Sequence, residues 1–212
     1  MKRKILLLGG GGHCKSVLDS LYALNEYDDI GIIDKNENVG KTLLNTLIIG
    51  TDADLQFLFD QGYKEAFVTV GSIGDAALRK KLTRVAENIG FKLATIIDPT
   101  SSVSKYSELE NGIFVGKKAV INAGSRIKNG AIINSGAIVE HDCEIGSYVH
   151  LSPGSVICGE VKIGEQTHIG ANTVIKQQVV IGRMTTIGMG SLVLKDIRSN
   201  IIAYGNPCRE VR

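Results

Sequence analysis

Tryptophan is absent from this 212-residue sequence, which has only 3 prolines against 25 glycines. This combination favours tight, regular turns over a disordered chain. No stretch reaches the roughly 18 apolar residues that indicate a membrane-spanning helix, so we expect no membrane insertion. The net charge of +2 likewise gives no indication of a nucleic-acid or membrane-surface partner.

The sequence also lacks the patterns of secreted and metal-binding proteins. Its four cysteines form no CxxC pair and no zinc spacing, which predicts free thiols and no metal site. The apolar run at the N-terminus, Ile5–Leu8, has four residues and ends in glycines, so it is too short for the apolar core of a signal peptide. We therefore expect a cytoplasmic protein with reduced cysteines at Cys14, Cys143, Cys158 and Cys208.

Strands and helices are expected to alternate in the first half of the chain. Apolar runs predict strands over 4–8, 29–33, 66–70 and 91–96, and helical spacing covers 15–24 and 75–88, with Asp75 as an N-cap. Strands that alternate with helices form parallel sheets with right-handed crossovers. The pattern therefore predicts an α/β, Rossmann-like domain over residues 1–97.

A six-residue period begins at Val103. Sixteen successive positions at this spacing, from Val103 to Val193, hold only Val, Leu or Ile. The positions two residues earlier are mostly small or β-branched, so each hexad directs one large and one small residue inward. Three hexads make an 18-residue triangular coil, and stacked coils bury these side chains against one another. The period predicts an all-β parallel β-helix over residues 98–212.

Three of the four histidines lie in the repeat, and His141 has the neighbours of a catalytic base. It comes two residues after the inward Val139, so the period places it at a corner of the coil, facing out. Either Glu140 or Asp142 can fix the tautomer of its imidazole and raise its basicity. A solvated histidine in a charged turn fits the pattern equally well, so both interpretations stay open.

His150 and His168 lie one 18-residue coil apart, each directly before an inward residue. We expect them to stack on one face, where they line a cleft or form a pair of surface rings. The separation of nine residues from His141 favours a cleft for His150, whereas a surface role is favoured for His168. Asn134 follows the inward Ile133, and it either binds substrate or holds a left-handed corner.

The first predicted strand is followed by four glycines and His13, where a helix begins. Such a backbone can cradle a phosphate or a sugar at a helix N-terminus, although Cys14 replaces the last glycine of the GxGxxG pattern. Asp34 ends the second strand, where Rossmann-like domains hold a nucleoside. A tight turn and a strand-end cap explain the same residues without a ligand. About a hundred residues leave little room for a dinucleotide site, which argues against a nicotinamide cofactor.

Several motifs from both halves occur together. The first half has the strand, glycines, His and Lys over 8–15, the acidic strand end at Asp34, and a Val-Gly turn at 70–71 followed by Leu-Arg-Lys-Lys at 78–81. The repeat has Ile-Asn-Ser-Gly at 133–136, EHDCEIG at 140–146, HLSPG at 150–154 and GNP at 205–207. Together these motifs resemble the NeuD/PglD group of sugar acyltransferases, which are hexapeptide-repeat proteins. The chain departs from the group at Asp98-Pro99, where His-Pro is frequent, and at Lys35, where some members carry a second acid.

The resemblance implies a left-handed β-helix, a homotrimer with active sites between neighbouring β-helices, and acetyl-CoA as co-substrate. It also implies that His141 is the general base and that Asp142 raises its basicity. The acetyl-CoA groove would be formed by His150, Gly159, Ala171 and Met189. The site for the sugar nucleotide would be formed by Gly11, Gly12, His13, Asp34 and Gly71. Lys35, which follows Asp34, and Asn134 are further candidate substrate contacts from their places in the sequence.

The leading hypothesis is acetyl transfer from acetyl-CoA to the amino group of a nucleotide-linked sugar, by direct attack on the thioester with His141 as base. A second hypothesis keeps the fold and acetylates a hydroxyl of a sialic-acid-type sugar. A third is a non-catalytic trimeric scaffold with a sugar-binding N-terminal domain, which the EHDC run at 140–143 disfavours.

Overall fold

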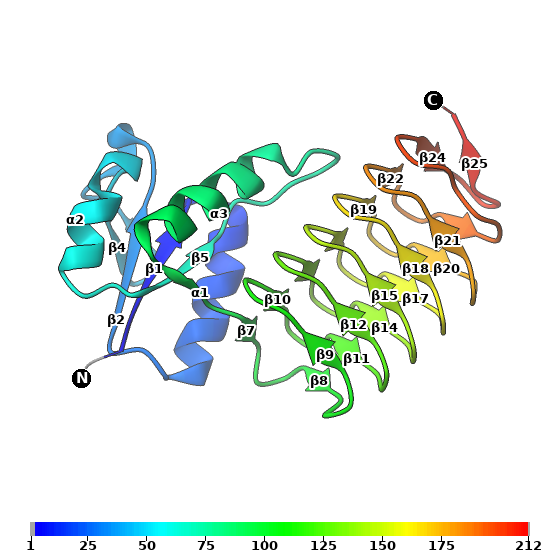
Figure 1. The fold of residues 1–212 in the computed structure, drawn as a ribbon, viewed down its shortest axis with the longest axis horizontal. Helices are drawn as coiled ribbons and strands as arrows, with labels where there is room; N and C mark the ends of the chain where they lie inside the picture. Colours follow the sequence, from blue (N-terminus) through cyan, green and yellow to red (C-terminus); the bar gives the residue numbers. More distant parts are fainter. Residues whose placement is uncertain (1–2, 212) are drawn as a thin grey trace. The chain divides into compact units, whose positions relative to one another are not determined.

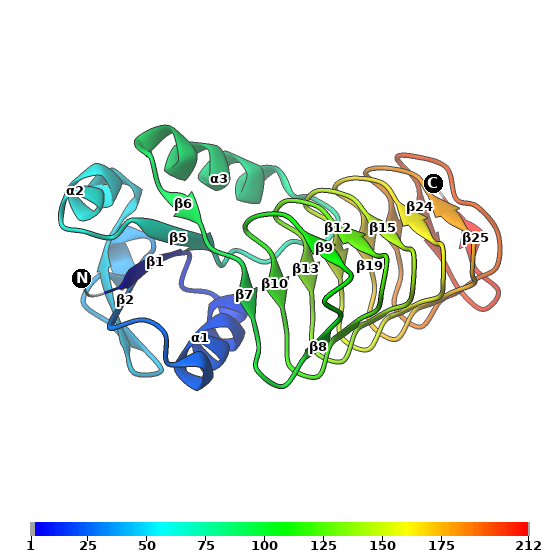
Figure 2. The same cartoon turned by 60° about the horizontal axis from the view of Figure 1, so that its bottom comes forward.

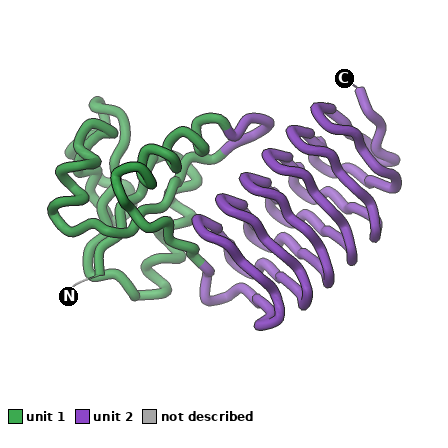
Figure 3. Tube along the Cα trace, in the orientation of Figure 1, with its two compact units in different colours: residues 1–71, 77–96 green, residues 72–76, 97–212 purple. Residues whose placement is uncertain are grey.

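The computed structural model describes residues 3–211, which fall into two compact units. Unit 1 contains the chain up to Gly71 and the segment Ala77–Ile96, and unit 2 contains Ser72–Ala76 and the residues from Ile97 onward (Figure 3). The short Ser72–Ala76 segment therefore groups with the second unit although it lies within the sequence of the first.

Unit 1 is built on a six-stranded sheet with the order β3-β4-β2-β1-β5-β6. Its strands are parallel except for the β3–β4 hairpin, which confirms the predicted α/β class. The hairpin was not predicted from the sequence. The strands are β1 (Lys4–Leu8), β2 (Asp29–Ile33), β3 (Thr42–Leu43), β4 (Thr46–Gly50), β5 (Glu65–Val68) and β6 (Lys92–Leu93).

The helices of unit 1 differ from the predictions at their ends. Helix α1 (Gly12–Leu24) begins three residues earlier than predicted, because the end of the glycine run already forms its first turn. Helix α3 (Ala77–Ile89) begins two residues after Asp75, so Asp75 is not the N-cap residue. The short helix α2 (Leu55–Asp60) and the 3₁₀ turns η1 (Asn36–Asn38) and η2 (Asp52–Asp54) were not predicted.

Unit 2 is a parallel β-helix whose strands stack into three sheets, here called face 1, face 2 and face 3 (Figures 1 and 2). Neighbouring strands pair residue i with residue i+18, as in Ile138 with Val156, which confirms the predicted 18-residue coil. Face 1 holds β7 (Ile96–Ile97), β10 (Phe114–Val115), β13 (Ile132–Ile133), β16 (His150–Leu151), β19 (His168–Ile169), β22 (Thr186–Ile187), β24 (Ile202–Tyr204) and β25 (Arg209–Glu210). Face 2 holds β8 (Ser102–Val103), β11 (Val120–Ile121), β14 (Ile138–Val139), β17 (Val156–Ile157), β20 (Val174–Ile175) and β23 (Leu192–Val193). Face 3 holds β9 (Glu108–Leu109), β12 (Arg126–Ile127), β15 (Glu144–Ile145), β18 (Lys162–Ile163) and β21 (Val180–Ile181).

The second residue of nearly every two-residue strand points into the β-helix. These are the positions of the six-residue period, and those from Val115 to Val193 are all buried, whereas Val103 and Leu109 are partly buried against the same core. The small positions two residues earlier are buried as well, from Ala119 to Ser191. The predicted alternation of a large and a small inward residue is therefore confirmed.

A second six-residue period sets the corners. Every sixth residue from Gly112 to Gly190 has a left-handed backbone, and eight of these residues are not glycine, among them Asp142. The glycines that directly follow inward residues are required by the close stacking of the coils. A Cβ on Gly146, for example, would lie only 2.6 Å from the backbone nitrogen of Glu165 on the next coil, which leaves no space for a side chain. Asn134 is not among the left-handed residues, which removes the corner interpretation for it.

None of the helices within residues 3–211 is long and apolar enough to cross a membrane.

Candidate active site

His141 lies at the corner between face 2 and face 3, in the turn that joins β14 to β15. Its Nδ1 lies 2.9 Å from Oδ2 of Asp142, and the two side chains are 58% and 62% exposed. The outward position given by the period is confirmed. Of the two carboxylates considered from the sequence, Asp142 forms the pair, whereas Glu140 accepts a hydrogen bond from Asn122 Nδ2 at 2.9 Å.

The pKa of His141 is raised above its ordinary value. The main cause is the hydrogen bond to Asp142, with smaller contributions from the nearby charges of Asp142, Glu140 and Glu160. In the neutral imidazole, Nδ1–H donates to Asp142, because a carboxylate only accepts. This arrangement leaves the lone pair on Nε2 available to accept a proton.

Two glycines leave space for the pair on the neighbouring coils. Gly159 lies one coil after His141, and a Cβ there would come within 2.6 Å of Nε2 and of Cε1. Gly124 lies one coil before Asp142, and a Cβ there would collide with Oδ1. A side chain at either position would displace the imidazole or the carboxylate, so the backbone itself borders the reactive nitrogen.

His150 lies on face 1 and not beside His141, because nine residues correspond to half a coil. Its Nδ1 lies 2.8 Å from the carbonyl oxygen of Ser72, so this nitrogen carries the proton and donates. Nε2 then accepts from Asn134 Nδ2 at 3.3 Å, and the Asn134 side-chain oxygen accepts from the Ser135 N–H at 2.8 Å. Asn134 and His150 are therefore joined in one chain of hydrogen bonds that ends on the Ser72–Ala76 segment.

His168 pairs with His150 in the next coil, as the 18-residue spacing predicts. The two rings meet edge to face with centroids 5.1 Å apart, and His168 is nearly buried. Its Nε2 lies 3.4 Å from Ser152 Oγ. The surface role favoured from the sequence is therefore wrong, because the His168 ring is buried and packs within the stack.

The residues expected to contact acetyl-CoA fall on different parts of the β-helix. Gly159 lies at the corner of His141, whereas Ala171 and Met189 lie on successive coils at the corner between face 1 and face 2, the corner of Asn134. Met189 is 80% exposed. Within one chain, face 2 separates these two groups.

The outward side chains of face 2 are apolar, unlike those of face 3. Face 3 carries alternating charges that form ion pairs, with Arg126 at 3.4 Å from Glu108 and Lys162 at 3.1 Å from Glu144. From β11 onward, the outward column of face 2 has no charged or polar residue: Val120, Ile138, Val156, Val174 and Leu192.

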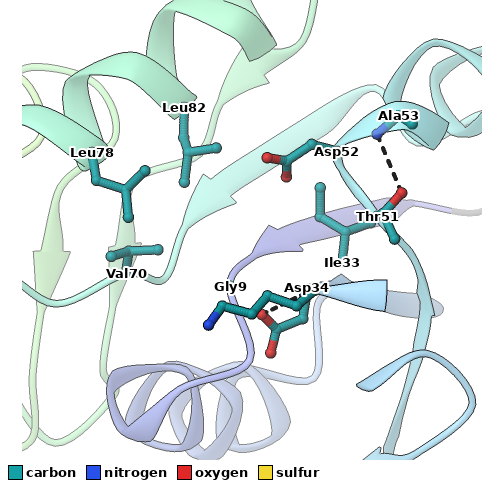
Figure 4. Close-up of a pocket in the computed structure, with 10 residues that line it drawn as sticks. Gly9, Ile33, Asp34, Thr51, Asp52, Ala53, Val70, Leu78 and Leu82 are labelled. Atoms are coloured by element: carbon teal, nitrogen blue, oxygen red, sulfur yellow. Dashed lines mark hydrogen bonds between the residues drawn. The ribbon is translucent and has the colours of Figure 1, made fainter. Parts of the chain in front are cut away.

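Unit 1 contains a pocket of about 370 Å³ at the carboxyl ends of β1, β2 and β5 (Figure 4). Asp34 and Lys35, both predicted substrate residues, line it. The Asp34 carboxylate accepts from the Lys35 N–H at 2.8 Å and from Asn38 Nδ2 at 3.1 Å. Other lining residues are Gly9, Ile33, Thr51, Asp52, Ala53, Val70, Leu78 and Leu82.

The other predicted substrate residues of unit 1 do not line this pocket. Gly11 and Gly12 form the beginning of helix α1, with open space where a Cβ would lie, and Gly71 packs beside His13. The pocket residues Thr51 and Asp52 were missed. Thr51 and Asp54 form a capping box, a Thr-x-x-Asp signal that the sequence does contain.

Within the described residues, no three His, Cys, Asp or Glu side chains come together in a way that could hold a metal ion. All four cysteines are free, as predicted. Burial raises the pKa of the Cys14 and Cys143 thiols to about 11, so both stay protonated and unreactive at neutral pH.

Comparison with known proteins adds to this geometry. A family model of the PglD N-terminal domain matches residues 4–86, and one of the bacterial transferase hexapeptide (six repeats) matches residues 124–159. No curated protein sequence matches the chain. The structure of the H141N mutant of perosamine N-acetyltransferase from Caulobacter crescentus, in complex with CoA and GDP-perosamine, is 36% identical with a TM-score of 0.93, covering 99% of this chain and 97% of that one.

Two further structures agree with this match. The acetyltransferase domain of PglB from Neisseria gonorrhoeae, in complex with acetyl coenzyme A, is 34% identical with a TM-score of 0.93, and the match covers 100% of both chains. WeeI from Acinetobacter baumannii, at 22% identity and a TM-score of 0.80 over 99% of this chain and all of that one, shares the fold. The fold is thus a PglD-like α/β domain followed by a left-handed β-helix, as expected. With 36% identity over 99% of its length, the chain belongs to the PglD/NeuD type of hexapeptide-repeat sugar acetyltransferases.

Proposed function

We propose that this protein transfers an acetyl group from acetyl-CoA to the amino group of a nucleotide-linked amino sugar. The observation that carries the proposal is the His141–Asp142 pair, joined at 2.9 Å on an exposed corner with the Gly159 backbone beside Nε2. The relatives crystallised with CoA and GDP-perosamine, or with acetyl coenzyme A, support this choice of substrates. We place the reaction in the cytoplasm.

In the proposed reaction, His141 is the general base. The amine nitrogen attacks the thioester carbon, and Nε2 of His141 takes up the proton that the amine loses. Asp142 holds the ring through Nδ1 and stabilises the imidazolium that forms. The tetrahedral intermediate then collapses, the C–S bond breaks, and His141 returns the proton to the departing thiolate. A well-placed general base contributes about 10²–10⁴-fold in rate.

Gly159 is the proposed source of oxyanion stabilisation. The negative charge of the intermediate lies on the former thioester oxygen, close to the atoms that react at Nε2. A backbone N–H can approach this oxygen only where no side chain intervenes, and the Gly159 backbone runs directly beside Nε2. His150, Ala171 and Met189 remain candidate contacts for the rest of acetyl-CoA.

The pocket of unit 1 is the proposed site for the nucleotide. Its volume of about 370 Å³ lies in the range of small-molecule sites. Figure 4 shows an apolar side formed by Val70, Leu78 and Leu82, which suits the face of a base, opposite the carboxylates of Asp34 and Asp52, which can accept hydrogen bonds from hydroxyl or N–H groups. The N-terminus of helix α1, with Gly11 as N-cap and Gly12 and His13 as its first residues, suits the phosphates. Lys35 and Gly71 complete this set of proposed contacts.

The proposed assembly is a homotrimer in which face 2 contacts neighbouring copies. An apolar column of five residues is the surface that gains most from burial, whereas the ion-paired face 3 is already suited to water. Copies that pack through face 2 around a three-fold axis bring the His141 corner of one β-helix towards the Asn134, Ala171 and Met189 corner of the next. One active site would then draw on two copies.

The test is an acetyl-transfer assay with acetyl-CoA and a panel of nucleotide-linked amino sugars, alongside free sialic-acid-type sugars. Thiol release measures the rate, and mass spectrometry identifies the acetylated product. We expect transfer to an amino sugar, and a loss of about 10²–10⁴-fold in His141→Ala with an unchanged melting temperature. Full activity of that variant would refute the base, and acetylation of the sialic-acid-type hydroxyl alone would replace the proposed acceptor.

A further inference from the structure

One buried hydroxyl closes the turn of His141 and Asp142 from inside the β-helix. Ser125 Oγ donates to the carbonyl oxygen of Glu140 at 2.6 Å and accepts from the Cys143 N–H at 3.1 Å. Glu140 directly precedes His141 and Cys143 directly follows Asp142, so this hydroxyl joins both ends of the segment that carries the pair. Ser125 is fully buried, out of reach of the substrates.

Cys143 repeats the arrangement one coil further on. Its Sγ donates to the carbonyl oxygen of Cys158 at 3.2 Å. Burial raises the pKa of this thiol to about 11, so the proton needed for donation is retained. This bond anchors the beginning of the 158–161 turn, which carries Gly159.

Stacking of the coils does not require such bonds. The same inward position holds Ala131 and Ala137 on neighbouring strands and Val161 and Val179 on the two coils after Cys143, and none of these side chains can form a hydrogen bond. Before the strands of face 3, Ser125 and Cys143 occupy this position on the two successive coils whose turns carry His141 and Gly159. Thr167, Thr173 and Thr185 make the same type of bond on later coils.

The same bonds also occur far from the site, which provides a control. Thr167 Oγ1 donates to the carbonyl oxygen of Gly182 at 2.8 Å and accepts from the Thr185 N–H at 3.2 Å. The 182–185 turn that it closes carries none of the proposed site residues. Thr167 is as deeply buried as Ser125, so the two positions differ in the turn they hold and not in their setting.

Packing does little to hold the side chains of the exposed pair, whereas the backbone of their turn is also bonded to the neighbouring coils, from Asp142 N–H to the Ala123 carbonyl oxygen at 3.0 Å and from Glu160 N–H to the His141 carbonyl oxygen at 2.9 Å. Because the His141 and Asp142 side chains are more than half exposed, packing does not fix their positions. Asp142 also has a φ of 59°, a left-handed conformation that non-glycine residues adopt infrequently. The geometry of the pair therefore depends on the backbone of its turn.

We propose that Ser125 and Cys143 are positioning residues of the active site. Ser125 holds the turn so that His141 stays hydrogen-bonded to Asp142, and Cys143 holds the next turn so that the Gly159 backbone stays beside Nε2. The role rests on the proposed acetyl transfer, and neither residue touches the substrates.

The first test compares Ser125→Ala with Thr167→Ala. Each removes one buried hydroxyl with two hydrogen bonds, and Thr167→Ala also removes a buried methyl group. Ser125→Ala should therefore lower the melting temperature by about 2–4 °C, and Thr167→Ala by at least as much. We expect kcat to fall about 10-fold or more in Ser125→Ala, since small displacements of catalytic groups are costly. In Thr167→Ala, kcat should stay within about 2-fold of wild type. KM for both substrates should change little, and Ser125→Thr should restore the rate because threonine fits the equivalent positions.

The second test measures the imidazole itself. NMR titration of His141 in the full-length protein should give a lower pKa in Ser125→Ala than in wild type or Thr167→Ala, because a looser turn weakens the bond to Asp142. This readout needs no activity. If wild type acetylates no sugar, the proposed function fails while the titration still tests the positioning role.

A third comparison addresses Cys143. Cys143→Ala should lower kcat with little change in the pKa of His141, and Cys143→Ser should retain most of the rate. Val179→Ala, at the same inward position two coils after Cys143, should leave the rate unchanged. Equal loss of kcat in Ser125→Ala and Thr167→Ala, or an unchanged His141 titration in Ser125→Ala, would overturn the proposal. Should Ser125→Ala fail to fold, Ser125→Cys against Thr167→Cys gives the same comparison.

Discussion

Ile138 and Val156 are register partners on face 2, and their side chains extend outward just before the turns that carry His141 and Gly159. The apolar column and the proposed catalytic corner are thus adjacent parts of the same two coils. A neighbouring copy that covers Ile138 and Val156 would also cover one side of the imidazole. Assembly and catalysis are therefore expected to fail together.

A charge on face 2 tests this link. We expect the double variant Ile138→Glu, Val156→Glu to be monomeric by light scattering, because burying two carboxylates in an apolar contact is costly. Its kcat/KM should fall by at least about 10²-fold. The control is Val180→Glu, the same change on the outward column of face 3, which should remain oligomeric and active. An active monomer would contradict both the interface and a site shared between copies.

The Asp142 carboxylate sets the pH dependence. It raises the pKa of His141, and the base works only when deprotonated, so kcat/KM should fall as the pH drops below that raised pKa. In Asp142→Asn, the pKa of His141 should return towards its ordinary value, and the limb of the pH profile should move to lower pH. The rate at high pH should fall about 10–100-fold, since a neutral partner neither fixes the ring nor stabilises the imidazolium. Glu140→Gln should shift the limb less, because the Glu140 carboxylate bonds to Asn122.

The six-residue period predicted which residues of the β-helix face in and which face out, because stacked coils repeat one environment at one spacing. It placed Val139 inward and His141 outward. The same period separates His141 from His150, because nine residues correspond to half a coil. The closeness of the two residues in sequence had instead favoured a shared cleft. The left-handed corner positions were not predicted, because residues as different as Asp142, Tyr148 and Met184 occupy them.

The remaining differences have local causes. The β3–β4 hairpin turns at Leu44, which has a left-handed φ of 50°, without the Asn-Gly or Asp-Gly signal of such turns. Helix α2 spans six residues, too few for a helical period to emerge. The bond from Ser125 to Glu140 joins residues 15 apart on successive coils, so it becomes visible only once the coils are stacked.

A side chain at Gly159 should impair activity without unfolding the protein. In Gly159→Ala, the new Cβ would lie 2.6 Å from Nε2, so the imidazole or the backbone must move. We expect kcat to fall about 10²-fold, from misplacement of the base and of the oxyanion donor together. The φ of Gly159 is not left-handed, so the fold should accept alanine and the melting temperature should change little. Steady-state kinetics measure the loss of kcat, and a thermal melt checks that the fold is retained. A kcat close to wild type would show that Nε2 is not the reactive nitrogen.

His150 is expected to restrain the Ser72–Ala76 segment, because its Nδ1–H donates to the Ser72 carbonyl oxygen at 2.8 Å. In His150→Ala this bond is lost. Because a typical hydrogen bond contributes a net stability of about 1 kcal/mol, its loss should increase the opening of the Ser72–Ala76 segment roughly 5-fold. Hydrogen exchange followed by mass spectrometry should show faster exchange in peptides that cover residues 72–76. His150→Asn is the matched control, since its amide N–H can replace Nδ1–H and should keep exchange close to wild type. Equal exchange in wild type and His150→Ala would mean that the bond does not restrain the segment. A selective rise in KM for acetyl-CoA in both variants would instead indicate that the His150 ring contacts that substrate.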